Sequence, residues 1–256
     1  MVLVVSWNVN SLRVRVNHLH DLIDENEPDV IMIQEIKCLN DEIPESLNKL
    51  NYDIFVNGEK GKYGVMTMVK KKNTIKIIDV NDDILMKEAR ILIVNVNGIN
   101  YVNIYMPNGN PLENVEKFNF KILWMERFIY LAHNLISNLE STLIGGDFNV
   151  IENEFDAKNF SEWEGDALTD ELTRKRFREL LGLGFINCVR LFEAPGKKFS
   201  FWDYQRGSWE RNNGVLIDHF LISPNLTSKL DNFEIKENFR SLPKPSDHVP
   251  LVLKLS

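Results

Sequence analysis

The stretch LIGGDFNV, residues 143–150, constrains this chain most, because an apolar segment runs directly into two glycines and two polar side chains. The leucine and isoleucine are typical of the end of a buried strand, and the glycines let a backbone turn tightly. Asp147 and Asn149 are two residues apart, so an extended segment places both side chains on one face. The pattern predicts either a polar site at a strand end or an ordinary turn, since Gly, Asp and Asn dominate turns.

Composition narrows the class of protein. Of the 256 residues, 44% are hydrophobic and 26% are charged, as in ordinary globular proteins, and no linker or low-complexity segment divides the chain. No apolar run approaches the roughly 20 residues that a membrane helix needs, and the N-terminus lacks the basic leader of a signal peptide. We therefore expect one domain, residues 1–256, and no membrane association.

Charge and cysteine usage add two weaker constraints. Cys38 and Cys188 are lone cysteines, which exclude a disulfide framework and a cysteine-based zinc site and suit a reducing cytoplasm. The net charge of −7 argues weakly against non-specific binding to polyanions. It does not exclude a nucleic-acid enzyme, because carboxylates gathered around a metal ion also lower the sum.

The first 35 residues predict a strand–helix–strand unit. A β-branched run leads into Asn8, a helix with regularly spaced apolar residues ends before Pro28, and a continuous apolar run closes on Glu35. The strand that ends at Asn8 and the one that ends at Asp147 look alike, which hints at two similar halves. A unit of this kind indicates an α/β domain.

The middle of the chain predicts an antiparallel meander followed by two helices. Short β-like segments separated by Gly- and Asn-rich turns span residues 52–56, 63–69, 74–80, 90–96 and 100–106. Amphipathic helices are predicted at 115–138 and 169–181, with an acidic, structureless loop at 152–165 between them. The basic run of the second helix indicates a solvated helix face.

Four carboxylates lie in or beside apolar strands, where an ionised group without a partner costs several kcal/mol. They are Glu35, Asp147, Asp218 and Asp247. One such residue is often a structural cap or an ion pair, but four of them, with Asn8, Asn149 and His248 in similar places, are hard to explain structurally. Strand ends are where open α/β sheets gather their sites, so we expect these side chains to converge.

The donor types indicate the metal and the chemistry. Oxygen donors without a cluster of cysteines or histidines suit Mg²⁺ or Mn²⁺ better than zinc. His248 lies beside Asp247 where a strand begins, whereas the other four histidines occupy positions typical of surface or core. A histidine oriented by an aspartate beside a metal can stabilise charge on a phosphate or transfer a proton. Together these groups are what phosphodiester hydrolysis needs.

Seven segments occur in the order seen in the exodeoxyribonuclease III / class II AP endonuclease family: SWNVNSLR, IQEIK, YGVMTM, IYMPNG, GGDFNV, LIDHFLIS and PSDHVPL. The chain resembles that family, part of the endonuclease/exonuclease/phosphatase superfamily, from residue 2 to residue 255. The NSLR, IYMPNG and FWDY segments favour its DNA-repair branch over the other phosphodiesterases of the superfamily.

The resemblance implies a four-layer α/β sandwich, with two mixed sheets packed face to face and helices outside. It implies a Mg²⁺-dependent DNA repair nuclease, with Mn²⁺ as a substitute, that cuts 5′ to an abasic site and leaves a 3′-hydroxyl. It also implies 3′–5′ exonuclease and 3′-end-trimming activity on double-stranded DNA, by a cytoplasmic monomer bound to the nucleoid through DNA. Two alternatives stay open: a phosphodiesterase for lipid headgroups or RNA, and a catalytically weak or inactive relative that binds DNA without cutting it.

The resemblance also assigns metal-binding and catalytic roles. Glu35 matches the principal metal-binding glutamate, with Asn8 and Asp247 near the same metal. Asp147 matches the acid that activates the attacking water, and Asn149 matches the amide that positions water or phosphate. His248 matches the catalytic histidine and Asp218 its orienting partner. Tyr105 matches the tyrosine whose hydroxyl supports the transition state.

Substrate contacts follow from the same comparison. Asn108 matches an asparagine that contacts the substrate phosphate, and Phe201 and Trp202 match the pocket for an abasic sugar, although core packing is an equally good interpretation of both aromatics. Val215 and Ile217 approach the same wall, and weaker phosphate contacts are assigned to Lys60, Lys62, Arg206 and Arg211. The chain departs from the family at Leu216, where an arginine is usual, so a cation is missing near the site.

Overall fold

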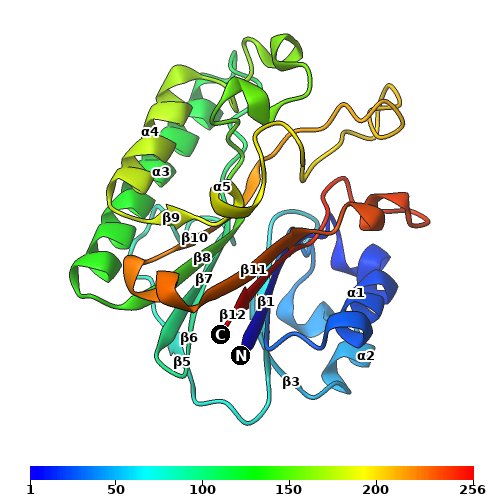
Figure 1. Ribbon diagram of the computed structural model, residues 1–256, viewed down its shortest axis with the longest axis vertical. Coiled ribbons are helices and arrows are strands. Elements are labelled where there is room, and N and C mark those ends of the chain that lie inside the picture. Colours follow the sequence, from blue (N-terminus) through cyan, green and yellow to red (C-terminus); the bar gives the residue numbers. More distant parts are fainter.

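Two six-stranded sheets pack face to face in this computed structural model, which describes residues 1–256 (Figure 1). The first sheet has the order β11 (Leu230–Ile235), β12 (Leu251–Leu255), β1 (Val2–Asn8), β2 (Val30–Gln34), β4 (Val65–Lys70) and β3 (Tyr52–Asn57). The second has the order β5 (Ile75–Ile78), β6 (Ile91–Val96), β7 (Ile99–Tyr105), β8 (Ser141–Asp147), β10 (Asp218–Ile222) and β9 (Ile186–Asn187).

Helices cover the outer faces of both sheets. Figure 1 shows α3 (Val115–Ser137) and α4 (Glu171–Gly182) on the outside of the second sheet. It shows α1 (Leu12–Asn26) and α2 (Glu45–Asn48) on the outside of the first sheet, at the opposite side of the molecule. The remaining helical segments are α5 (Val189–Phe192), η1 (Asn40–Glu42), η2 (Glu154–Asp156), η3 (Phe160–Trp163), η4 (Pro224–Lys229) and η5 (Glu237–Ser241). This arrangement confirms the predicted four-layer sandwich. No helix combines the length and apolarity that crossing a membrane would take.

Each sheet contains one parallel strand pair joined by a crossover helix. Strands β1 and β2 are parallel and connected by α1, as the opening pattern predicts, and β7 and β8 are parallel and connected by α3. The strands of Asn8 and Asp147, which look alike in sequence, are therefore not equivalent in the two halves. Asn8 ends the first strand of its parallel pair, whereas Asp147 ends the second strand of the other pair. The structural counterpart of Asp147 is Glu35, which directly follows β2.

Two expectations for the connecting segments are wrong. The predicted meander is divided between the sheets, because β3 pairs with β4 in one and β5, β6 and β7 pair in the other. Alternating polarity identifies strands, but the surface that a strand covers decides which sheet it joins. The acidic loop at 152–165 contains η2 and η3, and its Asp156 is buried in a two-pronged ion pair with Arg190.

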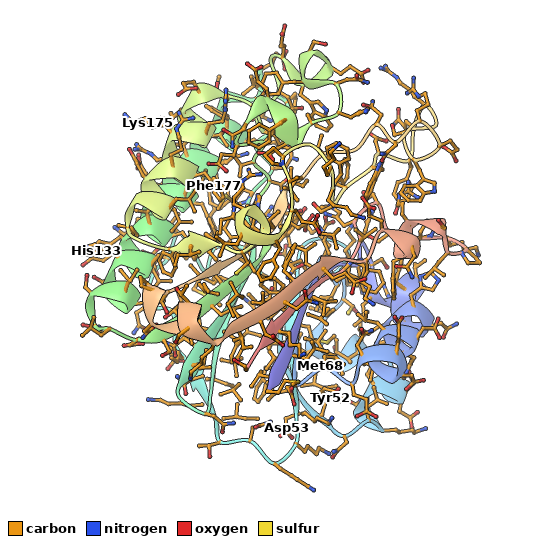
Figure 2. The ribbon with its side chains drawn as sticks, viewed as in Figure 1. Tyr52, Asp53, Met68, His133, Lys175 and Phe177 are labelled. Carbon is orange, nitrogen blue, oxygen red and sulfur yellow. The ribbon has the colours of Figure 1, made fainter.

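The charged face of α4 is partly solvated and partly paired. Figure 2 shows Lys175 projecting outward, while Phe177, two residues on, points toward the sheet. Arg176 is not free in solvent, because its guanidinium binds Glu179 one turn along and Glu126 of α3. The predicted solvated face therefore also joins the two outer helices.

A buried polar network connects the sheets beneath the ends of β2 and β7. The Gln34 side-chain amide donates to Asn103 Oδ1 (2.8 Å), and Asn103 Nδ2 donates to the carbonyl oxygen of Met66 (2.9 Å). Both side chains are fully buried. Since breaking these bonds would leave buried donors and acceptors without partners, this network favours the observed offset between the sheets.

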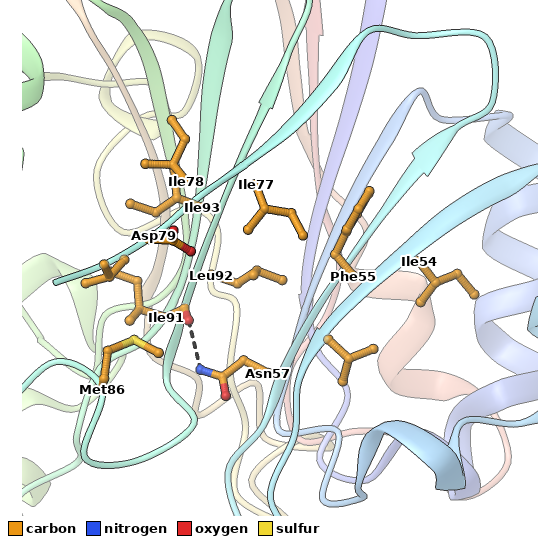
Figure 3. A pocket seen from close by; sticks show the side chains of 12 residues that line it. Ile54, Phe55, Asn57, Ile77, Ile78, Asp79, Met86, Ile91, Leu92 and Ile93 are labelled. Carbon is orange, nitrogen blue, oxygen red and sulfur yellow. Dashed lines mark hydrogen bonds between the residues drawn. The ribbon is translucent and has the colours of Figure 1, made fainter. Parts of the chain in front are cut away.

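An apolar cavity lies between the edge strands β3 and β5 (Figure 3). Its volume is about 400 Å³, and ten of its twelve lining residues are hydrophobic. Asn57 donates across it to the carbonyl oxygen of Ile91 (3.1 Å). It shares no lining residue with the carboxylates predicted to form the site.

The two glycines of the opening motif lie inside β8, so the turn interpretation is wrong. A Cβ at Gly145 would meet Met32 Cε at 2.4 Å, and one at Gly146 would meet the carbonyl oxygen of Ile104 at 1.9 Å. The missing side chains therefore let the facing sheet and strand β7 approach, and the strand continues to Asp147.

We expect Gly146→Ala to lower the free energy of unfolding by at least about 2 kcal/mol, because the new methyl group meets main chain that must move. Denaturant titration measures the change. Gly182→Ala is the matched control: this glycine ends α4 with open space around it, so alanine should be neutral or slightly stabilising. Equal effects of the two substitutions would contradict the packing argument.

Candidate active site

Strand ends from both sheets bring the predicted polar residues together. Asn8, at the end of β1, donates from Nδ2 to Glu35 Oε1 (2.8 Å) and to Asp147 Oδ2 (3.0 Å), so one buried amide bridges carboxylates of different sheets. Its Oδ1 accepts the backbone N–H of Asn10 (3.0 Å). Glu35 itself has a left-handed backbone (φ 52°), a strained conformation that functional sites often hold.

His248 is held between two aspartates. Asp218 and Asp147 are directly opposed across the antiparallel pair β10 and β8. The Nδ1 atom of His248 lies 2.8 Å from Asp218 Oδ2, and Nε2 lies 3.6 Å from Asp147 Oδ2. The bond to Asp218 fixes the ring orientation and directs Nε2 into the cluster. His219 points to the opposite face and packs against Phe148, in agreement with its predicted structural role.

Burial and charge shift the pKa values in this group. Burial lowers the pKa of His248, but the charges of Asp218 and Asp147 outweigh it and raise the pKa to about 10. Burial also raises the pKa of Asp147 above its usual range, against the opposing effect of the His248 charge. The imidazolium is therefore the favoured form, and Asp147 is a better base than an exposed aspartate.

Glu35, Asp147 and His248 each have a potential ligand atom, and these three atoms lie within 4.8 Å of one another. A protonated His248 has no free lone pair for a metal, so the two carboxylates are the groups that fit a divalent cation. Burial would raise the pKa of Glu35, but Lys37 (Nζ to Oε2, 2.9 Å) and the hydrogen bond from Asn8 keep it below its usual value, so the carboxylate is ionised. Two hard carboxylates match Mg²⁺ or Mn²⁺.

Asp247, the third predicted metal residue, does not join this group. Its Oδ1 accepts hydrogen bonds from Asn10 Nδ2 (3.1 Å) and from the Ser246 hydroxyl (3.3 Å). Asp247 therefore binds the Asn10 side chain, and it is not one of the three residues whose ligand atoms lie within 4.8 Å of one another. The position next to His248 in the sequence does not make Asp247 a member of the same cluster.

Three predicted catalytic or phosphate-binding residues lie beside the cluster: Tyr105 ends β7, and Asn108 and Asn149 lie on the loops after β7 and β8. Asn149 Nδ2 donates to the carbonyl oxygen of Met106 (2.9 Å), and Asn149 Oδ1 accepts from Asn108 Nδ2 (2.9 Å). Burial and the negative charge of Glu35 raise the pKa of Tyr105 well above its ordinary value, so its hydroxyl stays a donor. Asn108 and Asn149 therefore form a hydrogen-bonded pair beside the cluster.

The two aromatic residues predicted for the sugar pocket occupy different environments. Phe201 is half-buried and its ring lies 4.9 Å from the His248 ring, at the border of the cluster. Trp202 is completely buried, packs against Trp209 and donates to Asn212 Oδ1 (3.1 Å). Trp202 is thus a core residue, which corrects its predicted assignment as a pocket wall: its ring is enclosed by the core, whereas the ring of the adjacent Phe201 lies against His248.

The two arginines predicted to contact phosphate lie at the surface, and the position of the missing family arginine lies in the core. Arg206 and Arg211 are exposed on the loop between residues 203 and 213 and make no ion pair in the cluster. Leu216, in place of the family arginine, is buried in the main core, whereas Val215 and Ile217 are buried in a separate small apolar cluster. The Leu216 N–H donates to the Asp156 carbonyl oxygen (2.7 Å).

Two buried cations near the site were missed. Arg90 is stacked on Tyr63 and Tyr105, with its guanidinium carbon 4.0 and 4.6 Å from the ring centres, beside a groove of about 200 Å³. Lys121 is completely buried in α3. The sequence does carry a signal for the burial of Lys121, because this lysine lies on the apolar stripe of its helix, next to Ile122 and four residues before Met125.

Comparison with known proteins agrees with this geometry. The Endonuclease/Exonuclease/phosphatase family matches residues 5–248. Exodeoxyribonuclease III of Haemophilus influenzae is 28% identical, over 96% of this chain and 97% of its own length. Among solved structures, an AP endonuclease from Archaeoglobus fulgidus has a TM-score of 0.93 at 27% identity. The 3′ phosphatase NExo from Neisseria, bound to a product DNA hairpin, has a TM-score of 0.91 at 26% identity, and both structures cover 100% of each chain.

The face-to-face sandwich carries an aspartate–histidine–aspartate group at its strand ends, and the chain belongs to the Endonuclease/Exonuclease/phosphatase family. Within that family it is a nuclease of the exodeoxyribonuclease III and AP endonuclease branch. The catalytic and binding roles of the individual residues stay predictions.

In the metal-free protein, we expect His248 to make stability fall as the solution becomes alkaline. Its folded pKa of about 10 exceeds the 6.5 of an ordinary histidine, so its stabilisation is complete below pH 6.5 and is lost as pH rises through the folded pKa. Denaturant titration with a chelator present, from pH 6 to pH 10, should show a steeper fall for wild type than for His248→Gln. A constant difference between the two proteins would contradict the assigned charge.

Proposed function

We propose that this nuclease is a Mg²⁺-dependent DNA repair enzyme. It hydrolyses the phosphodiester 5′ to an abasic site, leaves a 3′-hydroxyl, and trims 3′ ends of duplex DNA by 3′–5′ exonuclease activity. The observation that carries the proposal is the Asp218–His248–Asp147 chain beside Glu35. Full-length similarity to proteins named as exodeoxyribonuclease III and AP endonuclease supports the substrate class.

The metal would be held principally by Glu35, and Asn8 orients the carboxylates of Glu35 and Asp147 by hydrogen bonds to both, so that Asp147 lies beside the metal as the base. When bound, a divalent cation supplies positive charge for the phosphate and orients water. Manganese can replace magnesium because both prefer oxygen ligands.

The protein's own groups then divide the remaining work. Asp147, with its pKa raised by burial, accepts the proton of the attacking water. His248, kept protonated by Asp218, presents positive charge from Nε2 to a phosphoryl oxygen. The Tyr105 hydroxyl donates a hydrogen bond because its raised pKa keeps the proton.

Substrate binding follows from the border of the cluster. Asn108 contacts the substrate phosphate, Arg90 contacts a neighbouring phosphate, and Phe201 covers one side of the abasic sugar. Such a nucleotide is inexpensive to extrude because it has no base to unstack. We further propose that the protein acts as a monomer in the cytoplasm at the nucleoid, where its two buried, unpaired cysteines stay reduced.

Pure protein with Mg²⁺ should incise an end-labelled duplex at a single abasic site and leave an extendable 3′-hydroxyl. Parallel duplexes with a nick, a recessed 3′ end and a 3′-phosphate measure end trimming. Lipid headgroup and RNA phosphodiesters are the controls, and preferential hydrolysis of either would replace DNA as the substrate. Tight binding of abasic DNA without incision at any Mg²⁺ concentration would contradict the enzyme assignment.

Asp147→Asn and His248→Ala should each lower kcat by at least about 100-fold, the usual contribution of a proton-transferring or charge-stabilising group. Asp83→Asn and His133→Ala are the matched controls, since both replaced side chains are exposed. The controls should retain wild-type rates. Losses below tenfold in both active-site variants would overturn the assigned roles.

A further inference from the structure

The buried ammonium of Lys121 has three main-chain acceptors and no carboxylate partner. Its Nζ donates to the carbonyl oxygens of Asn149 (2.7 Å), Asn108 (3.0 Å) and Ala167 (3.3 Å). The side chain is completely buried under these three segments. One cation therefore holds three separate loops at the same end of the sandwich.

Those loops carry site residues and bind one another. Asn108 and Asn149 are joined side chain to side chain (2.9 Å), and Asn110 connects the first loop to the third through Asp166 (2.9 Å). The first loop also rests directly on the lysine stem, because a Cβ at Gly109 would meet Lys121 Cδ at 2.6 Å.

An ammonium is the only form of this side chain that satisfies all three acceptors, since a neutral amine has two N–H groups and a lone pair. Burial lowers the pKa of Lys121 to about 7, against the charges of Asp166, Asp147 and Asp170. A leucine at this point of the helix would pack without that electrostatic cost. The cost of burying this lysine therefore indicates that it is needed to hold the loops and not to stabilise the helix.

We infer that Lys121 is a positioning residue of the nuclease, which fixes the Asn108–Asn149 pair relative to Asp147 by holding the carbonyl groups behind both asparagines. The inference rests on the proposed function, because it concerns the geometry of phosphodiester cleavage. It does not give Lys121 a contact with DNA, from which the loops separate it. Its effect should therefore appear in kcat and leave KM nearly unchanged.

Lys121→Met keeps the length of the side chain and removes every donor. With abasic duplex and saturating Mg²⁺, we expect kcat to fall by about 10- to 100-fold, the effect of misplacing reacting groups by about 1 Å. KM should stay within about threefold. Lys121→Arg keeps donors and charge, and should recover at least a part of the lost kcat. A side chain with only a packing role would show no such recovery.

Arg127→Met is the matched control, because it removes a cation from the exposed face of the same helix, where Arg127 binds Asp82. It should keep wild-type kcat. All assays are run below the unfolding transition of each variant. If Lys121→Met does not fold, Lys121→Gln is measured with the same expected separation of kcat from KM, and failure of both to fold overturns the inference.

The outcomes separate this inference from the proposed function. A wild-type protein that never incises DNA overturns the function itself. An active wild type together with a Lys121→Met variant within twofold of its kcat, or with loss in KM alone, overturns only the role of Lys121.

Discussion

The site depends on a fixed offset between the two sheets, because each sheet contributes part of it. Asn8 and Glu35 come from the first sheet and Asp147 from the second, so a slip of one residue would direct these side chains elsewhere. The fully buried hydrogen bond between Gln34 and Asn103 opposes that slip, since a slip would break the bond and leave its donor and acceptor buried without partners. Apolar packing alone would tolerate several offsets, whereas directional hydrogen bonds select one.

The loops at the strand ends are held by a second device, a buried cation on each crossover helix. Arg15 of α1 donates to the carbonyl oxygens of Asn10 and Pro245, both at 2.7 Å, just as Lys121 of α3 binds carbonyl groups beneath the other sheet's loops. Such loops have no strand partner to satisfy their main chain, so a multivalent donor stabilises them. The two halves of the fold thus solve the same problem with different side chains.

Electrostatics ties these devices to chemistry. Bringing Glu35, Asp147 and Asp218 together costs folding energy through desolvation and mutual repulsion. The charge of His248, and Lys37 against Glu35, offset part of that cost. A divalent cation would offset more, and this is the physical reason that the cluster fits a metal. Stability and catalysis therefore draw on the same small group of charges.

The sequence by itself determined the strands, the outer helices, the family and the polar residues at the strand ends, because apolar periodicity and short motifs are local properties. Only the tertiary structure decided which sheet each meander strand joins, that Gly146 lies within a strand, and that Trp202 is core. It also decided that Asp247 binds Asn10 instead of joining the group of Glu35, Asp147 and His248, and that Lys121 binds the carbonyl groups of three loops. Those facts depend on which surfaces meet across the sandwich, and contacts between residues far apart in the chain leave no periodic trace in it.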